Sequence, residues 1–173
     1  MHGILVVGVQ CVVAAPNCAL WGNMTANMRK DLLQLRRDKE EPGLRFLGLV
    51  CFLQHLLGRN FILESSGASK IFEKSSLSIL GDLGLQETKL DQCMFDAAQD
   101  EIPVKKSTKF VSNWALKNMD VRCDKGHDHQ RLRGQGQFGS RTAAAAQYPT
   151  KLCNVILDNI TSSSRPAQQD GGE

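Results

Sequence analysis

The sequence lacks an apolar run long enough to cross a membrane. Such a span needs roughly 18 to 20 uninterrupted apolar residues, and the candidate at the N-terminus, Ile4 to Ala15, is shorter. This run resembles the apolar centre of a secretory signal, but no Lys or Arg precedes it. We therefore expect a protein that makes no membrane contact and remains intracellular, in the nucleus or the cytoplasm.

Closely spaced cysteine pairs are also absent, and no Cys-x2-Cys occurs anywhere in the chain. Small secreted scaffolds carry a dense framework of cysteines, whereas scattered cysteines in apolar runs are typical of intracellular proteins. We therefore expect reduced thiols at all six cysteines, which are Cys11, Cys18, Cys51, Cys93, Cys123 and Cys153.

Aromatic residues make up only 6% of the chain, and the net charge is a weak +3. The hydrophobic content of 42% nevertheless supplies enough apolar side chains for the core of one ordinary domain. We expect this domain to cover residues 1–160. The small polar residues of the segment 161–173 predict a disordered tail.

The first half of the chain alternates apolar runs that favour strands and helices. Ile4–Ala14 has the pattern of a strand buried on both faces of a sheet, and Asn60–Glu64 has that of a second strand. Between them, an amphipathic helix should end at Glu40–Gly43, and the nearly uniform apolarity of Leu44–Leu57 predicts a buried helix.

The second half continues this alternation with strands at Thr88–Phe95 and Thr108–Ser112. Asn113 can cap a helix that runs to Met119, and Pro149 suits the start of a final helix. Strands that alternate with helices predict an α/β fold, here an incomplete Rossmann-like domain with a mostly parallel sheet flanked by helices.

Two polar side chains follow the first two predicted strands, and ligands bind beyond the carboxyl ends of parallel strands. Cys18 could attack an electrophilic carbon as a thiolate while Glu64 hydrogen-bonds the substrate ring. In that case the two side chains should lie within roughly 10 Å of each other. The alternative is that Cys18 is a small buried hydrophobe and Glu64 an ordinary carboxylate.

Three potential metal ligands, Cys123, His127 and His129, lie within seven residues on a loop that contains glycine. Zinc prefers a tetrahedral set of thiolate and imidazole ligands, so this loop could bind one zinc ion with Cys93 or Cys153 as the fourth ligand. The spacing matches no standard zinc finger. The alternative is that both histidines are ordinary surface residues.

Basic residues concentrate between Val104 and Arg141, where nine Lys or Arg outnumber three Asp and give a local charge of +6. With glycines interleaved, such a stretch can follow a nucleic-acid backbone, although it can equally be a solvated face with few aromatics for base stacking. The candidate nucleic-acid contacts are Lys105, Lys106, Lys109, Arg122, Lys125, Arg131, Arg133 and Arg141.

Several short segments together resemble an uncharacterised domain found in retrotransposon-type polyproteins of protists and fungi. The resembling segments are Ala15–Gly22, Gly58–Glu64, Leu90–Phe95, Lys105–Phe110, Arg122–His129 and Tyr148–Cys153. The resemblance implies an origin in a transposable element. It also implies that other segments of a larger polyprotein are partners.

That domain is in turn distantly similar to the cytosine-5 DNA methyltransferases. The similarity implies that Cys18 corresponds to the nucleophile and Glu64 to the acid that holds the pyrimidine ring. In that family, the elements that bind S-adenosylmethionine would precede Met1, so the chain is expected to be truncated and not to bind this cofactor. The Gly-x-Gly-x-x-Gly at Gly134 follows no predicted strand and does not replace them.

These observations predict a nucleic-acid-associated domain of transposable-element origin without catalytic activity in this chain. Two alternatives stay open. One is an active DNA methyltransferase-like enzyme with Cys18 as its nucleophile, and the other is a zinc-stabilised binding module.

Overall fold

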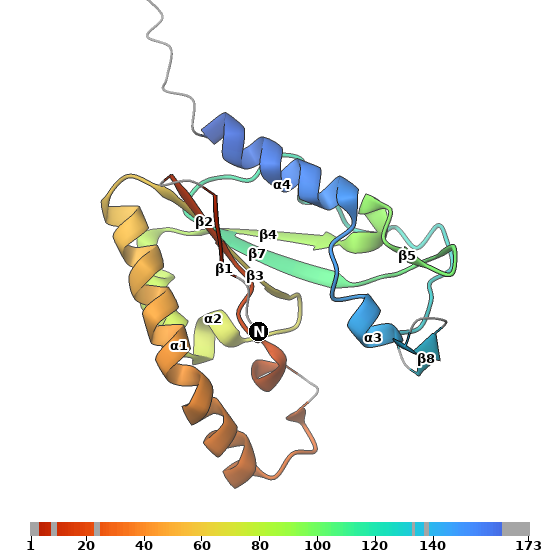
Figure 1. Ribbon diagram of the computed structural model, residues 1–173, viewed down its shortest axis with the longest axis horizontal. Helices are drawn as coiled ribbons and strands as arrows, with labels where there is room; N and C mark the ends of the chain where they lie inside the picture. Colours follow the sequence, from red (N-terminus) through yellow and green to blue (C-terminus); the bar gives the residue numbers. More distant parts are fainter. Residues whose placement is uncertain (1–3, 8–9, 23–24, 133, 137–138, 164–173) are drawn as a thin grey trace, which may run out of the picture.

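A computed structural model of the chain describes residues 4–7, 10–22, 25–132, 134–136 and 139–163 (Figure 1). At its centre is a five-stranded sheet with the strand order β1-β2-β3-β7-β4. Two two-stranded ribbons, β5-β6 and β8-β9, lie outside this sheet. The strands are β1 (Ile4–Val7), β2 (Cys11–Ala14), β3 (Asn60–Ser66), β4 (Gln86–Asp91), β5 (Ala98–Gln99), β6 (Ile102–Pro103), β7 (Ser107–Ser112), β8 (Gln135–Gly136) and β9 (Gly139–Ser140).

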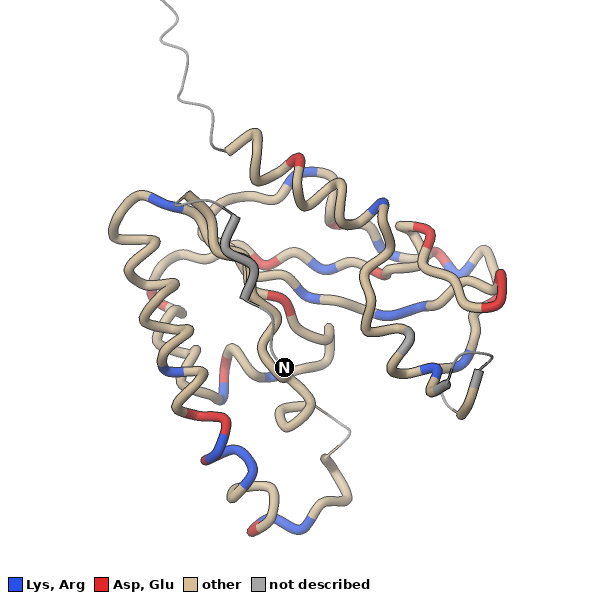
Figure 2. The backbone as a smooth tube through the Cα atoms, viewed as in Figure 1, with Lys and Arg blue, Asp and Glu red and all other residues tan. Residues whose placement is uncertain are grey.

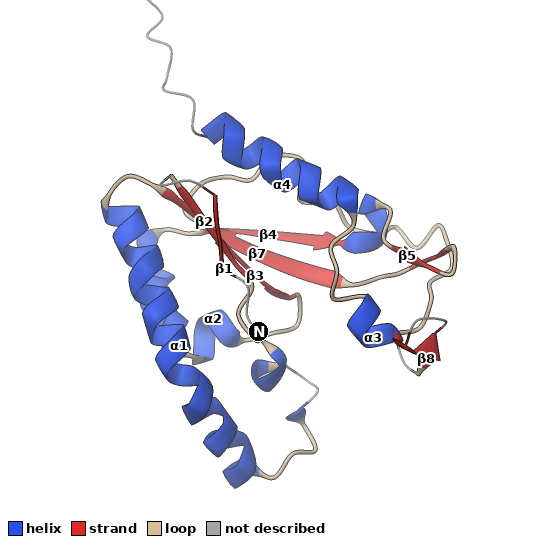
Figure 3. Cartoon of the chain, in the orientation of Figure 1, coloured by secondary structure: helices blue, strands red, loops and turns tan. Residues whose placement is uncertain are grey.

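Helices cover both faces of the sheet, which confirms the α/β class (Figures 1 and 3). One face is covered by α1 (Lys30–Leu56), α2 (Ile71–Lys74) and the 3-10 helix η3 (Ser76–Leu83), and the other by α4 (Thr150–Ser163). The other helices placed in full within the described residues are the 3-10 helices η1 (Ala19–Trp21) and η4 (Gln92–Phe95) and the short helix α3 (Arg141–Ala144).

Strand β3 is buried on both faces, as its apolar sequence predicted. Phe61 and Leu63 belong to the core under α1, whereas Ile62 belongs to the core under α4. Side chains alternate between the faces of a strand, so a strand with helices on both sides needs apolar residues in both directions. This explains the continuous apolar run of β3.

The expectation of a mostly parallel sheet is wrong for the described residues. Only β2 and β3 pair in parallel, while β1-β2, β3-β7 and β4-β7 are antiparallel. A parallel pair needs a long crossover connection, and α1 provides one between β2 and β3. The sheet is therefore mixed.

The predicted single strand Ile4–Ala14 is also wrong, because it is a hairpin. Ile4 pairs with Ala14, and Val7 pairs with Cys11. A uniformly apolar run shows no periodicity from which a reversal of the chain can be located. The hairpin places β1 at the edge of the sheet.

Helix α1 does not end at Glu40–Gly43 as predicted. It continues through Pro42 as one helix of 27 residues. A proline inside a helix removes one backbone hydrogen bond and usually favours a break. Pro42 and Gly43 lie on the exposed side of α1, so the core residues Leu44 and Leu47 can still pack on the sheet.

The predicted helix from Asn113 to Met119 is absent from the described structure. Instead of capping a helix, the Asn113 side chain accepts a hydrogen bond from the Phe61 backbone N–H at 3.0 Å and donates one to the Arg59 carbonyl at 2.8 Å. An asparagine amide can satisfy backbone groups of either kind. Here the bonds to Phe61 in β3 and to Arg59 just before it replace the cap.

The final helix agrees with its prediction at its start and exceeds it at its end. Helix α4 begins at Thr150, directly after Pro149, and extends to Ser163. The first three residues of the predicted 161–173 tail are thus helical, and the segment 164–173 lies outside the described residues. Among the described helices, none is both long enough and apolar enough to cross a membrane.

Candidate metal centre

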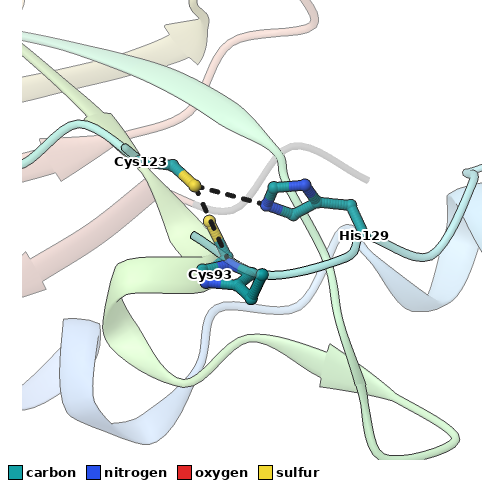
Figure 4. A group of neighbouring side chains, drawn as sticks. Cys93, Cys123 and His129 are labelled. Atoms are coloured by element: carbon teal, nitrogen blue, oxygen red, sulfur yellow. Dashed lines mark hydrogen bonds between the residues drawn. The ribbon is translucent and has the colours of Figure 1, made fainter. Parts of the chain in front are cut away.

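Four potential metal ligands gather where β4 ends. Cys93 lies in η4, directly after β4, and the other three ligands lie in the segment 122–129. The ligand atoms of Cys93, Cys123, His127 and His129 all lie within 4.8 Å of one another. Figure 4 shows the Cys123 sulfur pointing toward the His129 ring, with the Cys93 sulfur beside it.

The distances within this cluster fit a tetrahedral zinc site. The Cys123 Sγ lies 3.4 Å from the His129 Nε2 and 3.8 Å from the His127 Nε2. A zinc ion bonded to sulfur at ~2.3 Å and to nitrogen at ~2.0 Å with tetrahedral angles separates these two atoms by about 3.5 Å. These two separations are compatible with one zinc ion, so the two thiols and two imidazoles form a group that could hold a metal.

Asp91 attaches the segment that carries Cys123 to the end of β4. Its backbone N–H donates to the Val121 carbonyl at 3.0 Å, and its Oδ2 accepts from the Cys123 N–H at 3.0 Å. The carboxylate is buried, and the Lys105 Nζ and the Arg122 Nε each lie 3.8 Å from Oδ2. Because Cys93 follows Asp91 by two residues, these bonds hold both thiols at one place.

The turn after Cys123 directs backbone groups toward the sulfur. The Lys125 N–H donates to the Cys123 Sγ at 3.3 Å, and the Gly126 N–H donates to the Asp124 Oδ1 at 2.8 Å. Lys125 has a φ of 69°, a left-handed conformation that non-glycine residues rarely adopt. The turn thus places one backbone N–H donor against the Cys123 sulfur.

Burial raises the pKa of the Cys93 thiol to about 11, and its hydrogen bond with Cys123 and the nearby charges of Cys123 and Asp91 act in the same direction. Lys105 acts weakly against them. The metal-free thiol is thus protonated near neutral pH. Thiolate ligands must lose their protons when a metal binds, so a metal held here would displace the Cys93 proton.

The sequence prediction named three of these four ligands, Cys123, His127 and His129, and left the fourth open between Cys93 and Cys153. The structure places Cys93 in the cluster. Cys153 instead lies close enough to Tyr148 to affect its pKa. All six cysteines are free thiols, as expected.

Cys18 and Glu64, the predicted catalytic pair, have a common neighbour in Tyr148. Burial raises the pKa of the Tyr148 phenol, and the charge of Glu64, its hydrogen bond with Glu64 and the charges of Cys153 and Cys18 add to this effect. The Cys18 Sγ also accepts the Ser66 backbone N–H at 3.4 Å. Neither residue ends a strand, because Glu64 lies inside β3 and Cys18 lies four residues after β2. Their common neighbour Tyr148 was not identified from the sequence.

Glu64 is a buried carboxyl, with 7% of the residue exposed. Burial raises its pKa, and the nearby positive charge of Lys106 and a hydrogen bond with Tyr148 only partly oppose this. The Lys106 Nζ lies 5.6 Å from the centroid of the Tyr148 ring. The Glu64 carboxyl therefore already interacts with Tyr148 and Lys106 of the same chain.

We expect the variant Glu64→Gln to be more stable than the wild type at pH 7, with a difference that disappears toward pH 4. A raised carboxyl pKa means that the folded state keeps its proton while the unfolded state loses it above about pH 4.3. Folding stability is therefore lost as the pH rises from this value through the folded-state pKa. A glutamine can still accept the Tyr148 hydrogen bond but has no proton to lose.

Thermal melts of both proteins between pH 4 and 8 measure this difference. Glu87→Gln is the control, because its stability should change with pH in the opposite direction. Burial raises the pKa of Glu87, but the positive charges of Lys89 and Lys109 lower it by more, so that the pKa is lowered overall. That variant should lose stability relative to the wild type as the pH rises. If the stability difference between Glu64→Gln and the wild type does not change with pH, the pKa of Glu64 is not raised.

The predicted basic residues do not form one uniform surface (Figure 2). Lys109 has only 5% of its side chain exposed and lies 3.6 Å from Glu73 and 3.5 Å from Glu87, so it offers no free charge to a phosphate. Lys105 pairs with Asp91, and Lys106 lies over Tyr148.

Exposed cations instead flank the metal ligands. Arg122, Lys125 and Arg131 are exposed and lie before, between and after the ligands of the segment 122–129. Arg122 shares Asp91 with Lys105, but its side chain is 51% exposed, against 33% for Lys105. Arg141 is partly buried, with an Nε atom that has no hydrogen-bond partner among the described residues. Arg133 lies outside the described residues.

No family model, no curated protein and no solved structure matches this chain. The resemblances to retrotransposon polyproteins and to methyltransferases therefore stay predictions.

Proposed function

We propose that the chain is a zinc-stabilised, nucleic-acid-associated domain of transposable-element origin. The observation that carries the zinc-binding part of this proposal is the convergence of Cys93, Cys123, His127 and His129 to within 4.8 Å. The transposable-element origin is supported only by the resemblance of the sequence segments. The parallel β2-α1-β3 unit supports a Rossmann-like origin of the fold, since such units build those domains.

The chemistry of the cluster favours a structural role for the metal. Two thiolates and two imidazoles complete the tetrahedral coordination of zinc, whereas catalytic zinc keeps one position for water or substrate. Cys93 is 8% exposed, so little solvent reaches this ligand. The ion would connect η4 to the segment 122–129 and hold that segment in place.

Nucleic acid is the proposed partner because the held segment carries exposed cations. The exposed residues Arg122, Lys125 and Arg131 are the ones whose positions the metal would restrain. Phosphates are bound by Lys and Arg without base specificity, and a pre-ordered loop loses less conformational entropy on binding. We therefore expect weak, sequence-independent binding.

The test compares binding of short DNA and RNA duplexes and single strands at several salt concentrations by fluorescence anisotropy. The triple variant Arg122→Gln, Lys125→Gln, Arg131→Gln should flatten the log-log salt dependence by roughly 2 to 3 units, since each phosphate contact contributes about 0.7 to 0.9. The matched control, Lys30→Gln, Arg36→Gln, Lys39→Gln, removes three exposed cations from α1 and should bind like the wild type. An absence of binding in low salt, or an equal loss in the control, would refute nucleic acid as the partner while leaving the zinc site intact.

A further inference from the structure

One side of helix α1 carries exposed apolar side chains in a regular pattern. Phe46, Leu49, Leu53 and Leu56 are 61%, 56%, 54% and 64% exposed, and they are spaced three, four and three residues apart. This is the a and d spacing of a heptad repeat, the pattern by which two helices pack together in a coiled coil. Toward the N-terminus, the same heptad spacing leads from Leu49 to Leu35, which is also exposed.

The opposite side of α1 is already occupied. Leu44, Leu47 and Cys51 are buried in the core between α1 and the sheet. The predicted buried helix Leu44–Leu57 is therefore buried on one side only, because no described element packs on the stripe. Monomeric soluble proteins rarely expose contiguous apolar strips of this kind, which mark interaction surfaces.

The surface of α1 also contains a hollow suited to a side chain from a second helix. It is lined by Asp38, Glu41, Pro42, Arg45, Phe46 and Leu49. In the heptad register, Pro42, Arg45, Phe46 and Leu49 occupy positions d, g, a and d. Four residues of this kind form the hole that receives one knob in coiled-coil packing.

We propose that the stripe from Phe46 to Leu56 binds α1 of a second copy of this chain in an antiparallel pair. This inference is independent of the proposed zinc and nucleic-acid function. The residues 46–58 contain no Asp, Glu, Lys or Arg, whereas the residues 30–45 are rich in them. An uncharged stripe needs an uncharged partner, and a second copy offers one of equal length.

Antiparallel packing about a two-fold axis near Cys51 makes the stripe complementary to itself. Phe46 then meets Leu56 of the second copy, and Leu49 meets its Leu53, so that each a position faces a d position. A parallel pair would instead bring the two Lys39 side chains together in the seam, where like charges repel. The antiparallel overlap runs from Phe46 to Leu56, where α1 ends, and is about 16 Å long, which predicts a small interface and a concentration-dependent dimer.

Sedimentation velocity of the full chain between about 1 and 200 μM tests the proposal. We expect a monomer–dimer equilibrium for the wild type and a dissociation constant at least about 100-fold higher for Leu49→Glu, Leu53→Glu, because two charges at the centre of the interface remove its best-packed contacts. These leucines are exposed, so circular dichroism and the melting temperature should show a folded double variant. The milder Leu53→Gln should weaken the dimer less.

Two single variants serve as matched controls. Leu157→Glu changes an exposed leucine of α4, and Leu35→Glu changes one that lies on the stripe but outside the antiparallel overlap. Both should dimerise like the wild type. A wild type that is monomeric throughout, a dimer that survives Leu49→Glu, Leu53→Glu, or a Leu35→Glu variant that dissociates would each overturn the proposed antiparallel dimer.

Discussion

Removal of zinc is expected to lower the midpoint of thermal unfolding by roughly 8 to 16 °C. A ligand that binds only the folded state at 1,000 times its dissociation constant stabilises that state by ~4 kcal/mol. For a domain of this size, each kcal/mol shifts the midpoint by about 2 to 4 °C. The metal would thus supply a large fraction of the total stability.

The effect should be large because the ligand segment is held mainly at its two ends, where the Gln130 N–H donates to the Pro103 carbonyl at 2.8 Å at the far end. In the described residues between β7 and β8 there is no helix or strand. The hydrogen bonds from Asp91 fix one end of this segment, and the cluster fixes its middle. Melts of the zinc-loaded protein, of the chelated protein and of the chelated protein with zinc restored measure the shift, with magnesium as the control for ionic strength.

Single variants identify the ligands. Elemental analysis should find one zinc per wild-type chain and none after Cys93→Ser, Cys123→Ser or His129→Gln. Cys153→Ser is the matched control, because this free cysteine lies by Tyr148 rather than in the cluster. A wild-type chain purified in zinc without any bound metal, or a loss of zinc in Cys153→Ser, would rule out the assigned ligand set.

The second large effect is expected from Asp91→Ala, which should weaken zinc binding about 10- to 100-fold. The Asp91 carboxylate touches no ligand side chain, but it accepts the backbone N–H of Cys123 and lies 3.8 Å from Lys105 and from Arg122. Without it, Cys123 loses the bond that places its sulfur near Cys93, and two positive charges remain beside a site that attracts a cation. Competition with a chromophoric chelator measures the affinity.

Two further variants separate the causes of this effect. Asp91→Asn can still accept the Cys123 N–H but carries no charge, so an affinity close to that of the wild type would assign the role to the hydrogen bond. Asp96→Ala removes an exposed aspartate whose partner is Lys151, and it should leave zinc binding unchanged. If Asp91→Ala binds zinc like the wild type, Asp91 does not position the site.

Local sequence patterns predicted an element correctly where the whole segment has one kind of surroundings, either buried on both faces or following a clear start signal. Strand β3 is buried on both faces, and α4 follows a proline suited to a helix start, so both were predicted from nearby residues. The same reasoning was wrong for Ile4–Ala14, where uniform apolarity concealed a hairpin. It was wrong again at Pro42, where an exposed proline does not interrupt the buried side of α1.

The sequence by itself determined the ligand types and the short spacing of Cys123, His127 and His129, because one loop carries all three. Only the tertiary structure decided that Cys93 completes the cluster, since it lies 30 residues earlier on another element. Its position depends on hydrogen bonds from Asp91 at the end of β4. The exposed stripe of α1 has the same explanation: the apolar residues are evident in the sequence, but which of them the sheet covers depends on how the helix packs.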